Sequence, residues 1–269
     1  MDRRAAKLLL PMPRYRLTVA YDGTHFHGWQ KQRANDGETD LRTAQGVLEQ
    51  AVMEAVREPV SLVGASRTDA GVHAVGQAAA FTCERELPVD RLCAAINSRL
   101  PGDLQVRDAS IVDAAFSPIT DAIAKGYRYR IAWGRTGPGG VPRPLFGRYT
   151  TYWTPYHLDA VRMNEAARRL LGEHDFASFT RVNHQRESTV RTIHDCLVRK
   201  RRNRRLHIDV VGDGFLHNMI RIIAGTLIDV GRGRLEPDAM DGILAATDRS
   251  AAGDTLPPEG LCLMWIKYP

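Results

Sequence analysis

Asp69 stands in the run G-A-S-R-T-D-A-G-V-H-A, whose residue types and spacing are well suited to chemistry. Apolar stretches on both sides, Pro59–Ala65 and Gln77–Thr82, predict two strands with this loop between them. A carboxylate near the cation of Arg67, on a loop held by two strands, could act as a nucleophile or a base. The plainer interpretation is a turn in which Asp69 bonds its own backbone and Gly71 supplies a positive φ.

Two later stretches carry side chains that could assist such a carboxylate. Tyr127–Trp133 alternates aromatic and basic residues, which is typical of strands that stack bases and contact phosphates. An edge strand with snorkelling arginines would show the same pattern. In the helix expected over Gly214–Gly231, Asn218, Arg221 and Gly225 share one face, apart from the apolar stripe. An Arg beside a Gly predicts close approach of another group, and the alternative is a solvent-facing Arg.

Histidine and cysteine spacings argue against a metal site. His25 and His27 lie two residues apart, but no third ligand is nearby in the sequence. The four cysteines lie far apart without a C-x-x-C pair, which predicts buried thiols rather than a zinc site or a disulfide framework. We therefore expect no metal.

Composition places the chain among soluble globular proteins. It has 269 residues, of which 43% are hydrophobic and 25% charged, and its apolar runs are too short to span a membrane. The first residues resemble a signal peptide only superficially, because their apolar part ends after three leucines at Pro11. We expect residues 1–13 to form a loose extension and the protein to be cytoplasmic.

The formal charge of +6 is concentrated in one place. Arg199–Arg205 contains six basic residues and no acid, so the rest of the chain is close to neutral. Strand-like segments on either side, Val190–Val198 and Leu206–Val211, predict that this run is the tip of a hairpin. It could be a solvated loop that resists aggregation, or a finger that contacts the phosphates of a nucleic acid.

Hydrophobic periodicity predicts two α+β units. The first half shows the order strand, helix, strand, strand, helix, strand, which is typical of a split β-α-β arrangement. A second mixture of strands and helices follows from Ala122, so we predict units at residues 14–115 and 120–269 with a cleft between them. The remaining predicted strands are Arg14–Tyr21, Leu104–Val112 and Leu261–Lys267, and the remaining helices are Thr43–Arg57, Pro88–Ser98, Leu158–Leu171 and Glu236–Thr247.

Eight strings along nearly the whole chain together resemble the tRNA pseudouridine synthase A family. In order they are Y-D-G-T-H-F-H-G-W-Q-K-Q, T-A-Q-G-V-L-E, G-A-S-R-T-D-A-G-V-H-A, A-I-N-S-R-L-P, K-G-Y-R-Y-R-I, L-L-G-E-H-D-F-A-S-F, G-F-L-H-N-M-I-R-I-I-A-G-T-L and E-G-L-C-L. The R-T-D-A-G-V-H-A core is close to diagnostic of that family.

The resemblance implies a function and an assignment of site residues. The implied activity is cofactor-free isomerisation of uridine to pseudouridine in the anticodon stem-loop of tRNA, at positions 38, 39 and 40, by a homodimer. The family's essential aspartate falls on Asp69, its active-site tyrosine on Tyr127 and its arginine partner on Arg221, from which we expect a bidentate contact. We expect Arg67 and Arg128 to contact the substrate. The implied fold is two ferredoxin-like or RRM-like α+β domains whose antiparallel sheets combine around a central active-site cleft.

The chain departs from the family pattern in two places. Ser66 stands where a glycine is usual. Phe116–Ala122 replaces a pattern similar to F-H-A-R-F-x-A, so that Ser117 and Ile119 occupy the usual His and Arg positions, which are expected to contact RNA. Two other functions stay open: a non-catalytic RNA-binding or RNA-chaperone protein, which gives no reason for the Asp69 loop, and a small-molecule acid/base enzyme using Asp69 and a histidine.

Overall fold

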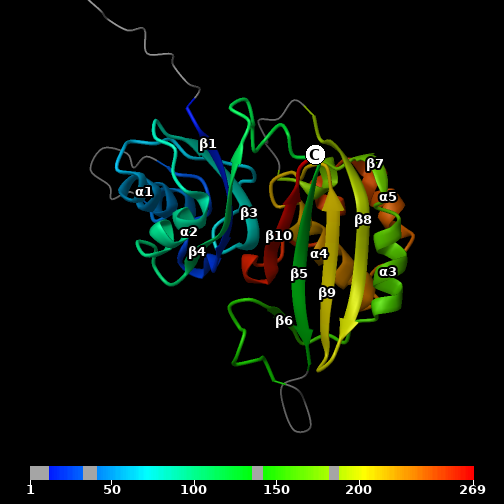
Figure 1. Cartoon of the computed structure of the whole chain (residues 1–269). Coiled ribbons are helices and arrows are strands. Elements are labelled where there is room, and N and C mark those ends of the chain that lie inside the picture. Colours follow the sequence, from blue (N-terminus) through cyan, green and yellow to red (C-terminus); the bar gives the residue numbers. More distant parts are fainter. Residues whose placement is uncertain (1–11, 33–40, 135–141, 182–187) are drawn as a thin grey trace, which may run out of the picture.

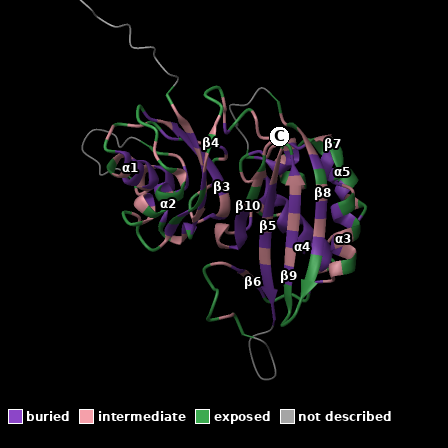
Figure 2. Ribbon diagram, in the orientation of Figure 1, coloured by how far each residue is buried: buried purple, intermediate pink, exposed green. Residues whose placement is uncertain are grey.

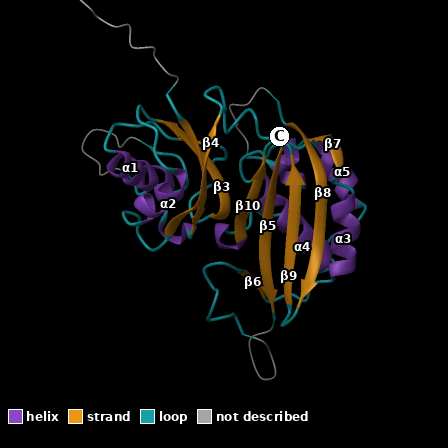
Figure 3. Ribbon diagram, viewed as in Figure 1, coloured by secondary structure: helices purple, strands orange, loops and turns teal. Residues whose placement is uncertain are grey.

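One sheet runs through the molecule. The computed structural model describes residues 12–32, 41–134, 142–181 and 188–269, so the predicted extension lies almost wholly outside the described residues. The sheet has the strand order β4-β1-β3-β10-β5-β9-β8-β7, and Figures 1 and 3 show it extending across both halves. Strand β2 pairs with β3, and β6 pairs with β5. The strands are β1 Arg14–Tyr21, β2 Val63–Gly64, β3 His73–Thr82, β4 Leu104–Val112, β5 Ala124–Trp133, β6 Tyr152–Thr154, β7 Gly172–Asp175, β8 Val190–Arg201, β9 Arg205–Gly212 and β10 Leu261–Lys267. The helices are α1 Ala44–Val56, α2 Val89–Asn97, α3 Ala160–Arg168, α4 Met219–Gly231 and α5 Ala239–Ala246.

The segment that enters the Asp69 loop is mostly not a strand, contrary to the prediction for Pro59–Ala65. Only the two residues of β2 pair with β3. Side chains of α1 bind the backbone just before β2. Gln45 Nε2 donates to Leu62 O at 2.7 Å, and Leu62 N donates to Glu49 Oε2 at 3.1 Å. Because buried backbone groups need a partner of some kind, these two side chains take the place of a neighbouring strand.

The last strand, β10, joins the sheets of the two halves. Its first residues pair in parallel with the start of β3, and its other edge pairs antiparallel with β5. The predicted combined sheet is therefore present, with parallel pairs at β3–β10 and β5–β6 that a hairpin could not make. Since β5 lies between β10 and β9, the edge-strand alternative for Tyr127–Trp133 is wrong. The division into units 14–115 and 120–269 stays a prediction.

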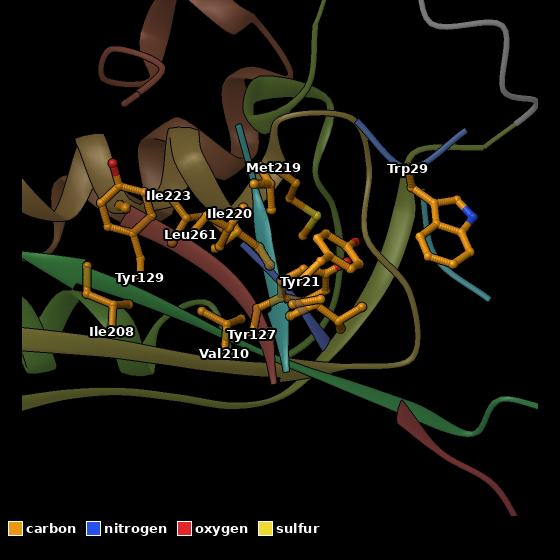
Figure 4. Packing of buried hydrophobic residues seen from close by; sticks show 14 of the residues in the cluster. Tyr21, Trp29, Tyr127, Tyr129, Ile208, Val210, Met219, Ile220, Ile223 and Leu261 are labelled. Carbon is orange, nitrogen blue, oxygen red and sulfur yellow. The ribbon is translucent and has the colours of Figure 1, made fainter. Parts of the chain in front are cut away.

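Helices α3, α4 and α5 cover one face of the second half of the sheet, and α2 packs against β4 in the first half (Figure 1). Buried and less buried residues alternate along β1, as expected for a strand with one face in the core. A single buried cluster extends through both halves (Figure 2), and Figure 4 shows Tyr21, Tyr127 and Met219 within it. In the described part of the chain, no helix is both long and apolar enough to cross a bilayer.

Helix α5 begins at Ala239 rather than the predicted Glu236, and α4 and α3 begin later than predicted because of the residues that precede them. Helix α4 begins at Met219 rather than near Gly214, since Asn218 has the left-handed φ of 62°. Helix α3 begins at Ala160 rather than Leu158, because Asp159 accepts hydrogen bonds from the backbone amides of Val161 and Arg162 and so caps the N-terminus; it ends at Arg168 rather than Leu171.

The backbone at residues 253–254 lies directly against α4. A Cβ on Gly225 would be 2.0 Å from Asp254 O, and Gly253 N donates to Thr226 Oγ1 at 2.9 Å. The close approach predicted from the Arg beside a Gly is confirmed, and the approaching group is the chain's own backbone.

Gly225→Ala is therefore expected to lower the free energy of unfolding by about 1–3 kcal/mol, because the added methyl group must displace this backbone. Gly242→Ala in α5 is the matched control, since a Cβ at that position would meet no atom of the described residues within 4 Å. That change is expected to raise stability by about 0.5–1 kcal/mol. Urea unfolding of both variants measures the difference, and equal effects would contradict the close packing at Gly225.

Candidate active site

The carboxylate of Asp69 contacts two side chains, one in the first turn of α4 and one just before this helix. Arg221 Nη1 lies 3.2 Å from Asp69 Oδ2, and His217 Nε2 lies 3.4 Å from Asp69 Oδ1. The Asp69 side chain is 27% exposed and that of Arg221 is 16% exposed. A partly open carboxylate thus has a fixed cation on one oxygen and an ionisable imidazole on the other.

The Asp69 loop is fixed by contacts on both of its sides. Thr68 O accepts a hydrogen bond from Trp29 N at 3.0 Å, and the hydroxyls of Thr68 and Tyr21 are 2.7 Å apart. Val72 N donates to Asp69 O at 3.1 Å, and Gly71 has a φ of 79°. The turn interpretation is therefore correct for the backbone, while the side chain of Asp69 still points to α4.

Arg221 is held by three acceptors. Its Nε donates to Leu256 O at 2.6 Å, and its Nη1 donates both to Asn218 Oδ1 at 2.7 Å and to Asp69. The solvent-facing alternative for this arginine is therefore wrong. The expected bidentate contact is also wrong, because the contact runs from Nη1 to a single carboxylate oxygen, while Leu256 O and Asn218 Oδ1 set the direction of the guanidinium.

Tyr127 comes from β5 and reaches the same loop. Its hydroxyl lies 2.9 Å from Ser66 Oγ, and its ring packs edge-on against Phe215 with centroids 5.3 Å apart. Burial, together with the nearby charge of Asp69, raises the pKa of Tyr127 to about 12, although the Ser66 hydrogen bond opposes this shift. The phenol is therefore protonated at neutral pH.

Ser66, the departure from the usual glycine, is itself clamped by a buried side chain. Gln77 Nε2 donates to Ser66 O at 2.6 Å, and Ser66 N donates to Gln77 Oε1 at 3.2 Å. Gln77 is completely buried. The serine hydroxyl is thus held at a fixed place beside the hydroxyl of Tyr127.

Not every predicted site residue reaches Asp69. Arg67 is exposed in the loop. Arg128 makes a bidentate contact with Asp209, at 2.6 and 3.1 Å, and as the neighbour of Tyr127 on a strand it points to the other face of the sheet. The Phe116–Ala122 segment is tied down elsewhere, through Arg14 Nε to Phe116 O at 2.6 Å.

His217 is the site residue that sequence reasoning missed. It belongs to one of the eight family-like strings, but helical periodicity could not place it, because it precedes the left-handed Asn218 where the regular turn of α4 begins. Ser66 was seen only as a small change in a loop, since its partner lies 61 residues away.

Metal ligands are not grouped anywhere in the described residues: no three His, Cys, Asp or Glu side chains lie together as an ion would need. His25 and His27, the pair considered above, are among those residues and belong to no such group.

Comparison with known proteins gives a consistent result. A family model described as tRNA pseudouridine synthase matches residues 17–118 and 166–269. A protein named tRNA pseudouridine synthase A from Caldicellulosiruptor saccharolyticus is 41% identical over 94% of this chain and 98% of its own length. One of the same name from Geotalea uraniireducens is 41% identical over 96% of this chain and 100% of its own length.

Solved structures match weakly. An archaeal box H/ACA sRNP Nop10–Cbf5 complex aligns with a TM-score of 0.34 and 11% identity, over 94% of this chain and 62% of that chain. This likeness is too low to support a conclusion about the site.

The Ser66–Tyr127 contact predicts a measurable coupling. Tyr127→Phe leaves Ser66 Oγ without its partner, and Ser66→Ala does the converse, so each is expected to lower the free energy of unfolding by about 1 kcal/mol. The double variant should lose less than the sum, with a coupling energy of about 0.5–1.5 kcal/mol. Urea unfolding of the four proteins gives this value; strict additivity would show that the hydroxyls do not interact.

Proposed function

Because the chain belongs to the tRNA pseudouridine synthase family, we propose that it converts uridine to pseudouridine in the anticodon stem-loop of tRNA, with Asp69 as the residue that acts on the ribose. The observation that carries this proposal is the contact between Asp69 and Arg221. These residues are 152 positions apart, yet the fold brings a carboxylate and a guanidinium together where the carboxylate is still partly open.

The reaction explains why a carboxylate is needed. The bond between N1 and C1′ breaks, the uracil turns over, and C5 bonds to C1′; N1 gains a proton and C5 loses one, so there is no net oxidation or hydrolysis. The reaction balance therefore needs neither a cofactor nor a metal. Ionised Asp69 could attack C1′ as a nucleophile or remove the C2′ proton as a base.

The side chains around Asp69 have separate roles in the proposed reaction. Arg221 supplies a positive charge at one oxygen and fixes the direction of the carboxylate, while the imidazole of His217 lies at the other oxygen. The family resemblance assigns to the ring of Tyr127 the role of packing against the uracil. Its hydroxyl is a poor base for the C5 proton, because a pKa of about 12 keeps it protonated.

Access requires the target nucleotide to leave the helix. A base in a stem cannot reach a carboxylate in this setting, so the nucleotide must be flipped out, which costs a few kcal/mol. We propose that phosphate contacts by the exposed Arg67 and by the basic hairpin offset this cost. We also infer that the enzyme works as a homodimer in the cytoplasm, as the family resemblance suggests.

Asp69→Asn is expected to abolish tritium release from tRNA labelled at C5 of uridine while changing the tRNA dissociation constant by less than about threefold. The amide keeps the size of the carboxylate but cannot act as a nucleophile or a base. The same variant separates this proposal from a non-catalytic RNA-binding protein. Turnover equal to that of the parent would remove Asp69 from the reaction.

Arg221→Lys is expected to lower kcat by at least about 100-fold with a smaller effect on KM, because a lysine cannot bind Leu256 O, Asn218 and Asp69 together. Arg232→Lys, at the other end of α4, is the matched control. Arg232 pairs with Asp229 at 2.6 Å and should tolerate the change. Single-turnover rates provide the test, and similar rates for the two variants would show that Arg221 has no special role.

A further inference from the structure

A pocket at the tip of the β8–β9 hairpin is not used by the site described above. It encloses about 610 Å³ and is lined on one side by Trp133, Gly134, Pro155 and His157. The other side is formed by residues 200–204, four of which are Lys or Arg. No acidic residue is among those that line it, so its walls favour an anion.

The cations of this pocket differ from others on the same hairpin in having no carboxylate partner. Arg128 and Arg199 share Asp209, at 2.6 and 3.5 Å. Within the described ranges, no carboxylate pairs with Lys200, Arg202 or Arg204. Their charge is therefore available to an external ligand.

His207 on β9 is partly buried next to the basic side chains of the hairpin. Burial, and then the charges of Arg128, Arg201 and Arg130, lower its pKa to about 4. The Nδ1 atom of His207 accepts a hydrogen bond from Arg201 Nε at 3.4 Å, as a neutral imidazole can. Of these arginines, Arg201 also lines the pocket.

The pocket is built on a fixed frame. Trp133 is 5% exposed, and its backbone N donates to Arg204 O at 3.1 Å, which ties the hairpin tip to the end of β5. Asn203 and Arg204 have left-handed φ values of 57° and 53°, so the turn itself is tight. The basic side chains therefore start from a defined backbone rather than from a long loop.

We propose that this pocket binds backbone phosphates of the RNA substrate, as a second anchor away from the nucleotide that reacts. The proposal rests on the function proposed above. Trp133 lies six positions beyond Tyr127 on β5. This corresponds to roughly 20 Å of strand, or about six stacked base pairs at about 3.4 Å each. The anchor would therefore hold RNA several base pairs from the target uridine and resist its loss while the base is flipped.

The test compares a triple variant, Lys200→Gln, Arg202→Gln and Arg204→Gln, with a control that removes the same charge elsewhere. The control is Arg57→Gln, Arg91→Gln and Arg168→Gln, which are exposed positions on other elements. Each protein is assayed for binding and tritium release with two RNAs: full-length tRNA, and a stem-loop too short to extend from Tyr127 to Trp133. Thermal unfolding confirms that both variants remain folded.

With full-length tRNA, the pocket variant should bind roughly tenfold or more weakly, and its slope of log K against log salt should be shallower by about 2–3. With the short stem-loop, it should match the control. Equal losses on both RNAs, or a pocket variant that matches the control on tRNA, would overturn the proposal. If the parent protein released no tritium from any labelled RNA, the proposed function would fail, while the binding measurements would still decide whether the pocket is an RNA anchor.

Discussion

The contact between Asp69 and Arg221 depends on a single continuous sheet. The carboxylate belongs to the loop before β3, and the guanidinium to the first turn of α4, which packs on the second half of the sheet. Strand β10 lies between the two halves and pairs with both. Without that strand the two groups would sit on separate bodies, and no local interaction in either half would place them within 3.2 Å of each other.

The ion pair does not supply the energy that holds the halves together. A partly exposed pair of this kind contributes about 1 kcal/mol or less. The shared hydrophobic cluster and the strand pairing of β10 supply the rigidity. Leu256 O and Asn218 then direct Arg221, while Trp29 and Gln77 direct the loop. The surrounding contacts thus position the ion pair of Asp69 and Arg221. The pair orients the Asp69 carboxylate rather than stabilising the fold.

Two sets of basic residues in this protein, one at Arg221 and Arg128 and one at the hairpin tip, have different roles. Arg221 and Arg128 each donate hydrogen bonds to acceptors within the protein, and these bonds restrict the orientation of their side chains. Lys200, Arg202 and Arg204 at the hairpin tip sit on a tight turn, and within the described ranges no carboxylate pairs with them. The first group fixes geometry within the protein, whereas the second presents charge outward. Basic residues of the same type therefore have different roles at different places along the chain.

The sequence by itself determined most of the elements, the Asp69 loop, the family and the basic hairpin, because periodicity, turn residues and charge runs are local properties of the chain. It also indicated that something would lie close to Gly225, although not that this would be residues 253–254. Tertiary structure alone decided that Arg221 binds one oxygen of Asp69 rather than two, since Leu256 O, 35 residues away, and Asn218 Oδ1 direct its guanidinium. It likewise brought His217 and Ser66 to the site and turned Arg128 away. Those outcomes depend on which backbone atoms and strand faces meet across long sequence separations, and no local pattern specifies that.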